Sequence, residues 1–317
     1  MAPVTLGLQF NGKILGPALV SGFTSAGLYA LIAVALVLSY RVSRTVAFIH
    51  GGLTLMGALL FYWLTAPKFG TETHPQLSKF LGLAIVIALG ALIAGVYGLA
   101  VTGQRMAAWP RVTLTTFSLA GMLLLAGVLF EVISVEAQQP PSPFGTRSFR
   151  LFGQFVSMHQ LMTLIIVAAI VAVLSVALKV TRIGIYVRAI ADNVEGSRLV
   201  GVPINQVGTG VFAVSGAIAA LGGALLASAV GIDAGGIVSV FLRALIVSVM
   251  GGFNSLGLAL GGAVLLGVAD NSLRSGVFGP LDGGVQEMLV IGVIFAAVVG
   301  LNRVRSQGRE LLQAEGM

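Results

Sequence analysis

The chain has 317 residues, of which 57% are hydrophobic and only 9% are charged, and its mean hydropathy is +1.01. Because a soluble domain carries about 25% charged residues, this composition excludes a water-soluble globular protein and indicates an integral membrane protein with many crossings. The sequence has no cysteine, which excludes disulfides, thiolate catalysis and Cys-bound metals. The net charge is +7, but the basic residues form no patch that stands apart from the apolar segments, so we expect no nucleic-acid partner.

Apolar runs predict eight full membrane crossings and one short or broken span. The full spans are expected at about residues 15–40, 46–65, 80–102, 112–133, 158–178, 206–230, 256–273 and 286–301, and the short one at 237–250. The fold class is therefore an all-α membrane protein, a polytopic bundle of about eight transmembrane helices plus a short or broken one. We expect a single domain over residues 1–317, in which the 43 glycines let helix backbones approach closely.

A proline-rich stretch at about residues 134–156 separates the fourth and fifth spans. Pro140, Pro141 and Pro143 exclude a helix at that point. We therefore expect an irregular external loop or interfacial segment.

The stretch 181–205 is polar and lies between two spans. Read as a helix from about Gly184, it places apolar residues on one face: Val187, Ile190 and Val194. Charged residues at ion-pair spacing lie on the other face: Arg188 with Asp192, and Glu195 with Arg198. Gly201 followed by Pro203 is a stop signal. This pattern predicts a short, stiff amphipathic helix with a docking surface, and the alternative is a polar loop that only turns the chain.

The distribution of basic residues predicts an orientation. With the stretch 181–205 in the cytoplasm, most of the 18 Lys and Arg residues fall in cytoplasmic segments. The N-terminus is then expected outside and the C-terminus in the cytoplasm.

Motifs for catalysis are missing from the sequence. Of the three histidines (His50, His74 and His159), His74 and His159 lie at loop ends and neither has a carboxylate at metal-ligand spacing, and there is no phosphate-binding loop. We expect no catalytic residue, no metal site and no ATP hydrolysis by this chain.

Few ionisable residues fall within the spans: His50, Glu131, Arg243 and Asp270. No acid is expected clearly at mid-depth, which argues against a proton-coupled carrier. His50 and Arg243 are candidates for a transport path. The alternatives are an interfacial histidine with one hydrogen bond, and an arginine that reaches out to the interface.

A glycine pattern occurs twice. Gly51-Gly52 precedes Gly57, and Gly251-Gly252 precedes Gly257, each at the opening of a span. Paired glycine-interrupted segments in two halves of a chain indicate a central pathway in transporters, although such pairs also arise by chance in a glycine-rich chain.

Three ordered motifs resemble those of permeases of the branched-chain amino acid ATP-binding-cassette (ABC) importers. They are Tyr29-Ala-Leu-Ile-Ala33 with Phe48-Ile-His-Gly-Gly52, the stretch from Thr181 to Gly201, and Arg243-Ala244 with Gly251 to Leu256. The resemblance implies a coupling role for Arg182, Gly184, Arg188, Ala189, Asp192, Glu195 and Gly201. It implies path residues among His50, Gly51, Gly52, Arg243, Gly251, Gly252 and Asn254.

The same resemblance implies a set of partners. These are a second permease, homologous or identical, two ATP-binding subunits, an extracytoplasmic substrate-binding protein and membrane lipid. The chain itself would hold no cofactor, because ATP binds to the partner subunits. The expected place is the plasma (inner) membrane of a prokaryote, and the expected cargo is branched-chain amino acids. Urea or short-chain amides are an alternative, and a stand-alone secondary carrier is a further one.

Overall fold

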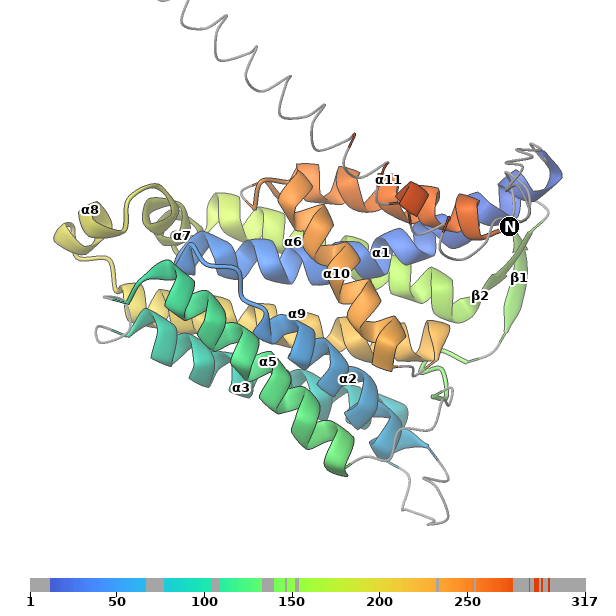
Figure 1. Ribbon diagram of the computed structural model, residues 1–317, viewed down its shortest axis with the longest axis horizontal. Coiled ribbons are helices and arrows are strands. Elements are labelled where there is room, and N and C mark those ends of the chain that lie inside the picture. Colours follow the sequence, from blue (N-terminus) through green and yellow to red (C-terminus); the bar gives the residue numbers. More distant parts are fainter. Residues whose placement is uncertain are drawn as a thin grey trace, which may run out of the picture.

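The computed structural model describes residues 12–66, 77–103, 109–132, 140–145, 147–151, 154–231, 234–253 and 255–275, with a few residues beyond them, and it is an almost entirely helical bundle (Figure 1). The helices are α1 (Gly12–Ser43), α2 (Ile49–Thr65), α3 (Lys79–Thr102), α5 (Arg111–Val132), α6 (Met158–Val180), α7 (Arg182–Asp192), α8 (Val194–Leu199), α9 (Ile204–Val230), α10 (Ala234–Met250) and α11 (Leu256–Arg274).

Six helices are long and apolar enough to cross a membrane: α1, α3, α5, α6, α9 and α11. The helices α2 and α10 are apolar but shorter. The prediction of an all-α, multi-pass membrane fold is therefore confirmed. The expected last span at 286–301 lies largely outside the described residues.

A short hairpin interrupts the stretch that was expected to be irregular. Strands β1 (Ser148–Leu151) and β2 (Gln154–Ser157) pair antiparallel, with Ser148 opposite Ser157. Ser157 then opens α6 through a capping box with Gln160. The expectation of an irregular segment is wrong for this part, whereas the proline-bearing residues 140–145 are non-helical as predicted.

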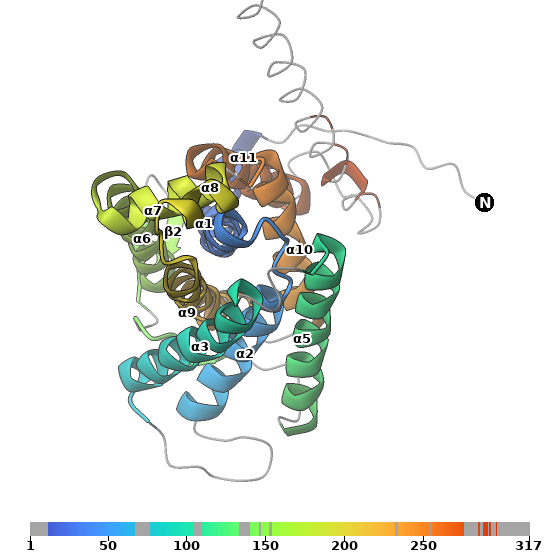
Figure 2. The same cartoon turned by 90° about the vertical axis from the view of Figure 1, so that its left-hand side faces the viewer.

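The helices α1 and α9 form the centre of the bundle, and α1 is surrounded by other helices in the end-on view (Figure 2). Glycines allow α9 to touch its neighbours directly. A Cβ on Gly57 would overlap the Ala220 carbonyl, and a Cβ on Gly223 would overlap the Thr54 carbonyl. The backbones of α2 and α9 are therefore in contact, which is the packing that small residues permit in lipid.

The second span begins later than predicted. Residues Val46–Phe48 are not helical, and the hydroxyl of Ser118 on α5 accepts from the Phe48 amide and donates to the Val46 carbonyl. Because the Ser118 side chain forms hydrogen bonds with these backbone groups, they do not take part in helical hydrogen bonds, and α2 starts only at Ile49.

The repeated glycine pattern does not repeat as local structure. Gly51 and Gly52 lie in the first turn of α2, whereas Gly251 and Gly252 form the turn between α10 and α11, where Gly252 has φ 60°. The helices α2 and α11 nevertheless both run away from the end that carries α7 and α8 (Figure 1).

Candidate functional site

The polar stretch forms two helices, α7 and α8, which project from one end of the bundle (Figure 1). Thr181 caps α7 through its hydroxyl, which accepts from the Gly184 amide. Asn193 is extended (φ −151°, ψ 109°), and its side chain accepts from the Gly196 amide. The prediction of one continuous helix is therefore wrong, because an Asn side chain offers the backbone an alternative to helix and starts a new one. Gly201 has φ 80°, and the chain leaves the helix there as the stop signal predicted.

The two faces of α7 are as predicted. Val187 and Ile190 are buried against the bundle. The charged residues of the predicted outer face, Arg188, Asp192 and Glu195, are exposed, and so is the coupling candidate Arg182. The helix therefore presents a charged surface and is anchored by an apolar one.

The predicted ion pairs along this surface are not formed. Within the described residues, the ion pairs recorded involve Asp270 with Arg243 and with Arg274. The Arg188 guanidinium instead donates to the Leu178 carbonyl. This carbonyl lies in the last turn of α6 and lacks a helical partner, so a cation satisfies it.

Gly184 strengthens the same junction. A Cβ on this residue would overlap the backbone of Leu178, so only glycine allows α7 to fold back so closely on α6. Two of the predicted coupling residues, Gly184 and Arg188, thus fix the angle between α6 and α7.

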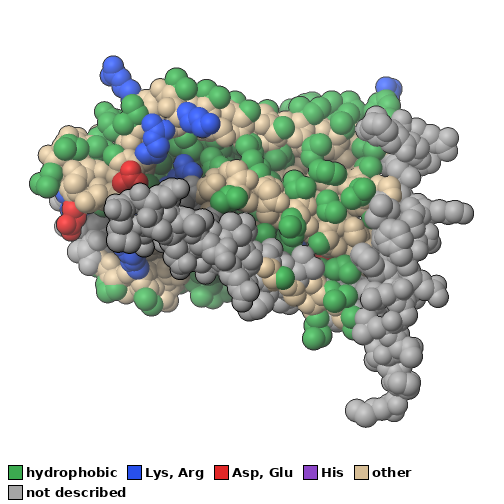
Figure 3. Space-filling view, turned by 90° about the horizontal axis from the view of Figure 1, so that it is seen from above, with side chains coloured by type: hydrophobic (Ala, Val, Ile, Leu, Met, Phe, Trp, Pro, Cys, Tyr) green, Lys and Arg blue, Asp and Glu red, His purple; other side chains and the backbone are tan. Residues whose placement is uncertain are grey.

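The surface of the helix pair also carries exposed apolar side chains. Leu199 is 89% exposed, Val200 is 79% exposed and Ile183 is 62% exposed. The charge-based prediction missed these residues, although the position of Leu199 and Val200 directly before Gly201 was visible in the sequence. Most Lys and Arg side chains on the face shown in Figure 3 also lie at this end of the molecule. An exposed patch that mixes apolar and charged groups indicates a protein contact.

A cavity of about 510 Å³ lies between this helix pair and the same end of the bundle. It brings together charged residues that are far apart in the sequence: Arg44, Arg111, Asp192, Glu195 and Arg198. The exposed helix pair therefore stands over a polar space at the end of the bundle.

His50 is completely buried and not interfacial. Its Nδ1 lies 3.0 Å from the Ala47 carbonyl and its Nε2 lies 2.9 Å from Ser215 Oγ on α9. Gly51 and Gly52 are buried as well and allow α2 to approach Met122 on α5. These three candidate path residues join helices inside the subunit, and the candidate Asn254 lies outside the described residues.

Arg243 is also buried, so the alternative of an arginine that reaches out to the interface is wrong. Its Nε lies 3.8 Å from Oδ2 of Asp270, which is 3% exposed. Tyr29 on α1 donates to the same oxygen (2.9 Å), and Arg274 Nε donates to Oδ1 (2.9 Å). Asp270, which the sequence placed near the end of a span, therefore has its carboxylate buried between α1, α10 and α11. In the sequence, the one pattern that could have indicated a partner for Asp270 was its i,i+4 spacing to Arg274.

A membrane-spanning bundle with a projecting pair of helices and a buried polar cluster defines a multi-pass membrane transport subunit. Residues 18–299 match the protein family described as "Branched-chain amino acid transport system / permease component". The match covers most of the chain, so the chain belongs to this family of ABC importer permeases. Permease subunits of this family are not themselves enzymes.

Individual relatives are similar at low identity. The permease protein BraD of a high-affinity branched-chain amino acid transport system from Pseudomonas aeruginosa is 26% identical over 273 residues, covering 82% of this chain and 86% of the relative. The corresponding protein LivH from Salmonella typhimurium is 25% identical over 270 residues, covering 79% and 83%. The ribose import permease protein RbsC from Haemophilus influenzae is 27% identical over 222 residues, covering 67% and 66%. No solved structure matches the chain.

Proposed function

We propose that this chain is the translocation subunit that moves branched-chain amino acids into the cytoplasm of a prokaryote, driven by ATP hydrolysis on separate subunits. The names of the relatives BraD and LivH support this cargo. The gathering of basic residues around α7 and α8 supports a cytoplasmic position for that end. The N-terminus then lies outside and the C-terminus in the cytoplasm.

The exposed surface of α7 and α8 carries the proposal. Two ATP-binding subunits dock on this surface, one for each of two permeases, with Leu199 and Val200 as apolar anchors and Arg182, Asp192 and Glu195 as charged neighbours. The junction held by Gly184 and Arg188 transmits displacement of the docked subunit to α6. Ala189 and Gly201 keep the roles in coupling that the motif implies.

The transport path lies between this permease and a second one, homologous or identical, and an extracytoplasmic binding protein delivers the substrate. His50, Gly51, Gly52 and Arg243 fix the helices that border the path, because they are buried within the subunit. Gly251 and Gly252 shape the turn at the end of α10, and Asn254 stays a path candidate on the motif alone.

Purification of the complex in mild detergent tests the docking. An ATPase is expected to co-elute with the wild-type chain and to be lost with Leu199→Asp. The matched control is Val112→Asp, which changes a side chain that is 77% exposed at the start of α5. Transport by the permease in vesicles without any ATPase would refute the proposal.

A second cargo is favoured by one observation, the similarity to the ribose permease RbsC. Calorimetry on the cognate binding protein with leucine, ribose, urea and a short-chain amide separates these substrates.

A stand-alone carrier gains support from the buried Asp270. Transport into ATPase-free vesicles with an imposed proton gradient would favour such a carrier, and no transport there would exclude it.

A further inference from the structure

The cavity of about 510 Å³ between the helix pair and the end of the bundle is lined by charges of both signs. Arg44 follows α1 and Arg111 begins α5, so two arginines line the cavity from the bundle. Asp192 ends α7 and Glu195 lies in the first turn of α8, so two carboxylates line it from the helix pair. A third arginine, Arg198, lies in the last turn of α8. Both carboxylates therefore belong to the helix pair, and both charges on the bundle side are positive.

These opposite charges do not neutralise one another. In the part of the chain that the structure describes, the ion pairs are those of Asp270, and none joins two residues of this cavity. Arginines and carboxylates that line one space without pairing keep their hydrogen-bonding groups available to a ligand with charges of its own.

The backbone holds Arg44 in an uncommon conformation. Its φ is 54°, in the left-handed region that residues other than glycine rarely adopt. The Arg44 amide donates to the Tyr40 carbonyl (2.8 Å). On the other side, the Ser43 hydroxyl accepts from the Thr45 amide (3.3 Å). Such conformations persist where surrounding contacts fix them, and they are frequent at ligand sites.

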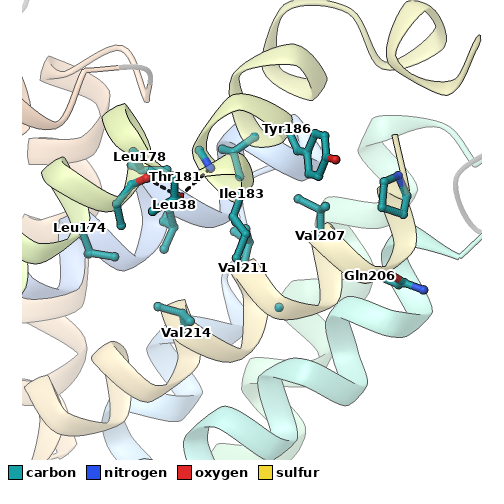
Figure 4. A pocket seen from close by; sticks show the side chains of 15 residues that line it. Leu38, Leu174, Leu178, Thr181, Ile183, Tyr186, Gln206, Val207, Val211 and Val214 are labelled. Atoms are coloured by element: carbon teal, nitrogen blue, oxygen red, sulfur yellow. Dashed lines mark hydrogen bonds between the residues drawn. The ribbon is translucent and has the colours of Figure 1, made fainter. Parts of the chain in front are cut away.

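The uncharged part of the lining is largely aliphatic. Its buried aliphatic side chains come from four separate elements of the fold: Val42, Val101, Leu114 and Ile190. The cavity of about 530 Å³ between α6, α7 and α9 also has an aliphatic lining, but no charged residue lines it (Figure 4). Of these two cavities, the one at the end of the bundle therefore combines an apolar surface with groups that select a charged ligand.

The charges indicate the kind of ligand. A polyphosphate would meet the two carboxylates and a simple cation would meet the three arginines, and like charges at a binding surface weaken association. An α-amino acid carries a carboxylate, which arginine binds in bidentate geometry, and an ammonium group, which the carboxylates bind. An aliphatic side chain would cover the apolar lining. The volume of about 510 Å³ lies within the range of about 300–1,000 Å³ that is usual for small-molecule sites.

We propose that this cavity binds a free α-amino acid with an aliphatic side chain. Its carboxylate lies at the two arginines of the bundle and its ammonium group at the two carboxylates of the helix pair. The bound molecule ties the helix pair to the bundle, so an accumulated product slows the transport cycle. The cargo and this feedback rest on the proposed function, whereas the site rests on the lining of the cavity.

The fluorescence of Trp109, which lines the cavity, reports on the ligand. The other tryptophan of the chain, Trp63, lies in the last turn of α2, which runs away from the helix pair (Figure 1). In the intact transporter, without binding protein and ATP, leucine should change the emission with saturation, and Trp109→Phe should remove this change. N-acetylleucine lacks the ammonium group and leucinamide lacks the carboxylate. Each should bind at least about tenfold more weakly, because it leaves charged groups of the cavity without a partner.

Arg111→Gln and Arg44→Asn each remove one positive charge from the bundle side and should weaken leucine binding at least about fivefold. Both variants should fold, because Arg111 is exposed and asparagine tolerates the positive φ of Arg44. The control Lys179→Gln removes an exposed positive charge in the last turn of α6, outside the cavity, and should bind leucine as the wild type does.

The proposal is overturned by the absence of a saturable change at Trp109, by equal binding of either analogue, or by wild-type binding in both arginine variants. Leucine should also slow ATP hydrolysis by the wild-type transporter at least about twofold and leave that of Arg111→Gln unchanged, because a ligand shifts a protein towards the state that it binds. Hydrolysis that leucine does not slow in the wild type overturns the feedback. Leucine binding is read without ATP, so its failure is distinct from a failure of the ATPase to co-elute.

Discussion

Replacement of Asp270 with leucine should destabilise the bundle more than any other single change in its polar cluster. The carboxylate lies 2.9 Å from Tyr29 Oη and 3.8 Å from Arg243 Nε. Removal of one partner from a buried ion pair costs about 3–5 kcal/mol, because the remaining charge stays in an apolar environment. Arg274 adds little to this figure, since its side chain is 48% exposed. Removal of the hydrogen bond alone, by Tyr29→Phe, costs only about 0.6–1.7 kcal/mol between membrane helices.

Thermal unfolding of the detergent-purified complex measures this difference. At about 2–4 °C per kcal/mol, Asp270→Leu should lower the midpoint by about 6–20 °C and Tyr29→Phe by about 1–7 °C. The double variant Asp270→Leu, Arg243→Met should recover much of the loss, because an apolar replacement of a whole buried pair is often neutral. The reasoning is refuted if the double variant is no more stable than Asp270→Leu, or if Asp270→Leu is no worse than Tyr29→Phe.

Three further changes test other parts of the structure. Gly223→Leu should abolish a monodisperse peak in size-exclusion chromatography, because its Cβ would overlap an α2 carbonyl, whereas Gly257→Leu in open space should not. Asn193→Ala removes the cap of α8 and should cost about 1 kcal/mol of local stability; hydrogen exchange should accelerate in α8 alone, and uniform acceleration would contradict a local role. Ser215→Ala removes a partner of His50 and should lower the unfolding midpoint by less than Asp270→Leu does, and an equal loss would contradict the assigned contacts.

The membrane helices could be predicted from the sequence because each needs about 20 apolar residues. The predicted spans at 80–102 and 206–230 agree closely with α3 and α9. The start of α2 could not be predicted, because Ser118 on another helix takes the backbone groups of Val46 and Phe48. Such a partner is set by tertiary packing and leaves no local pattern.

The same distinction holds for the site. The 3.6-residue period predicted the buried face of α7 at Val187 and Ile190, since that face depends only on local geometry. The contact of Arg188 with Leu178 and the burial of Asp270 depend on how separate helices meet. Charge spacing along one helix therefore suggested the wrong partner for Arg188.

The short connection between α6 and α7 has a mechanical consequence. A single residue, Thr181, separates the two helices, and the contacts of Gly184 and Arg188 with Leu178 remove the remaining freedom at this elbow. If the proposed docking on α7 and α8 holds, we expect a push on α7 to displace α6, whose most hydropathic stretch is only 17% buried, more than α9, whose backbone contacts α2. Motion would then enter the protein through an outer helix and not through the central one.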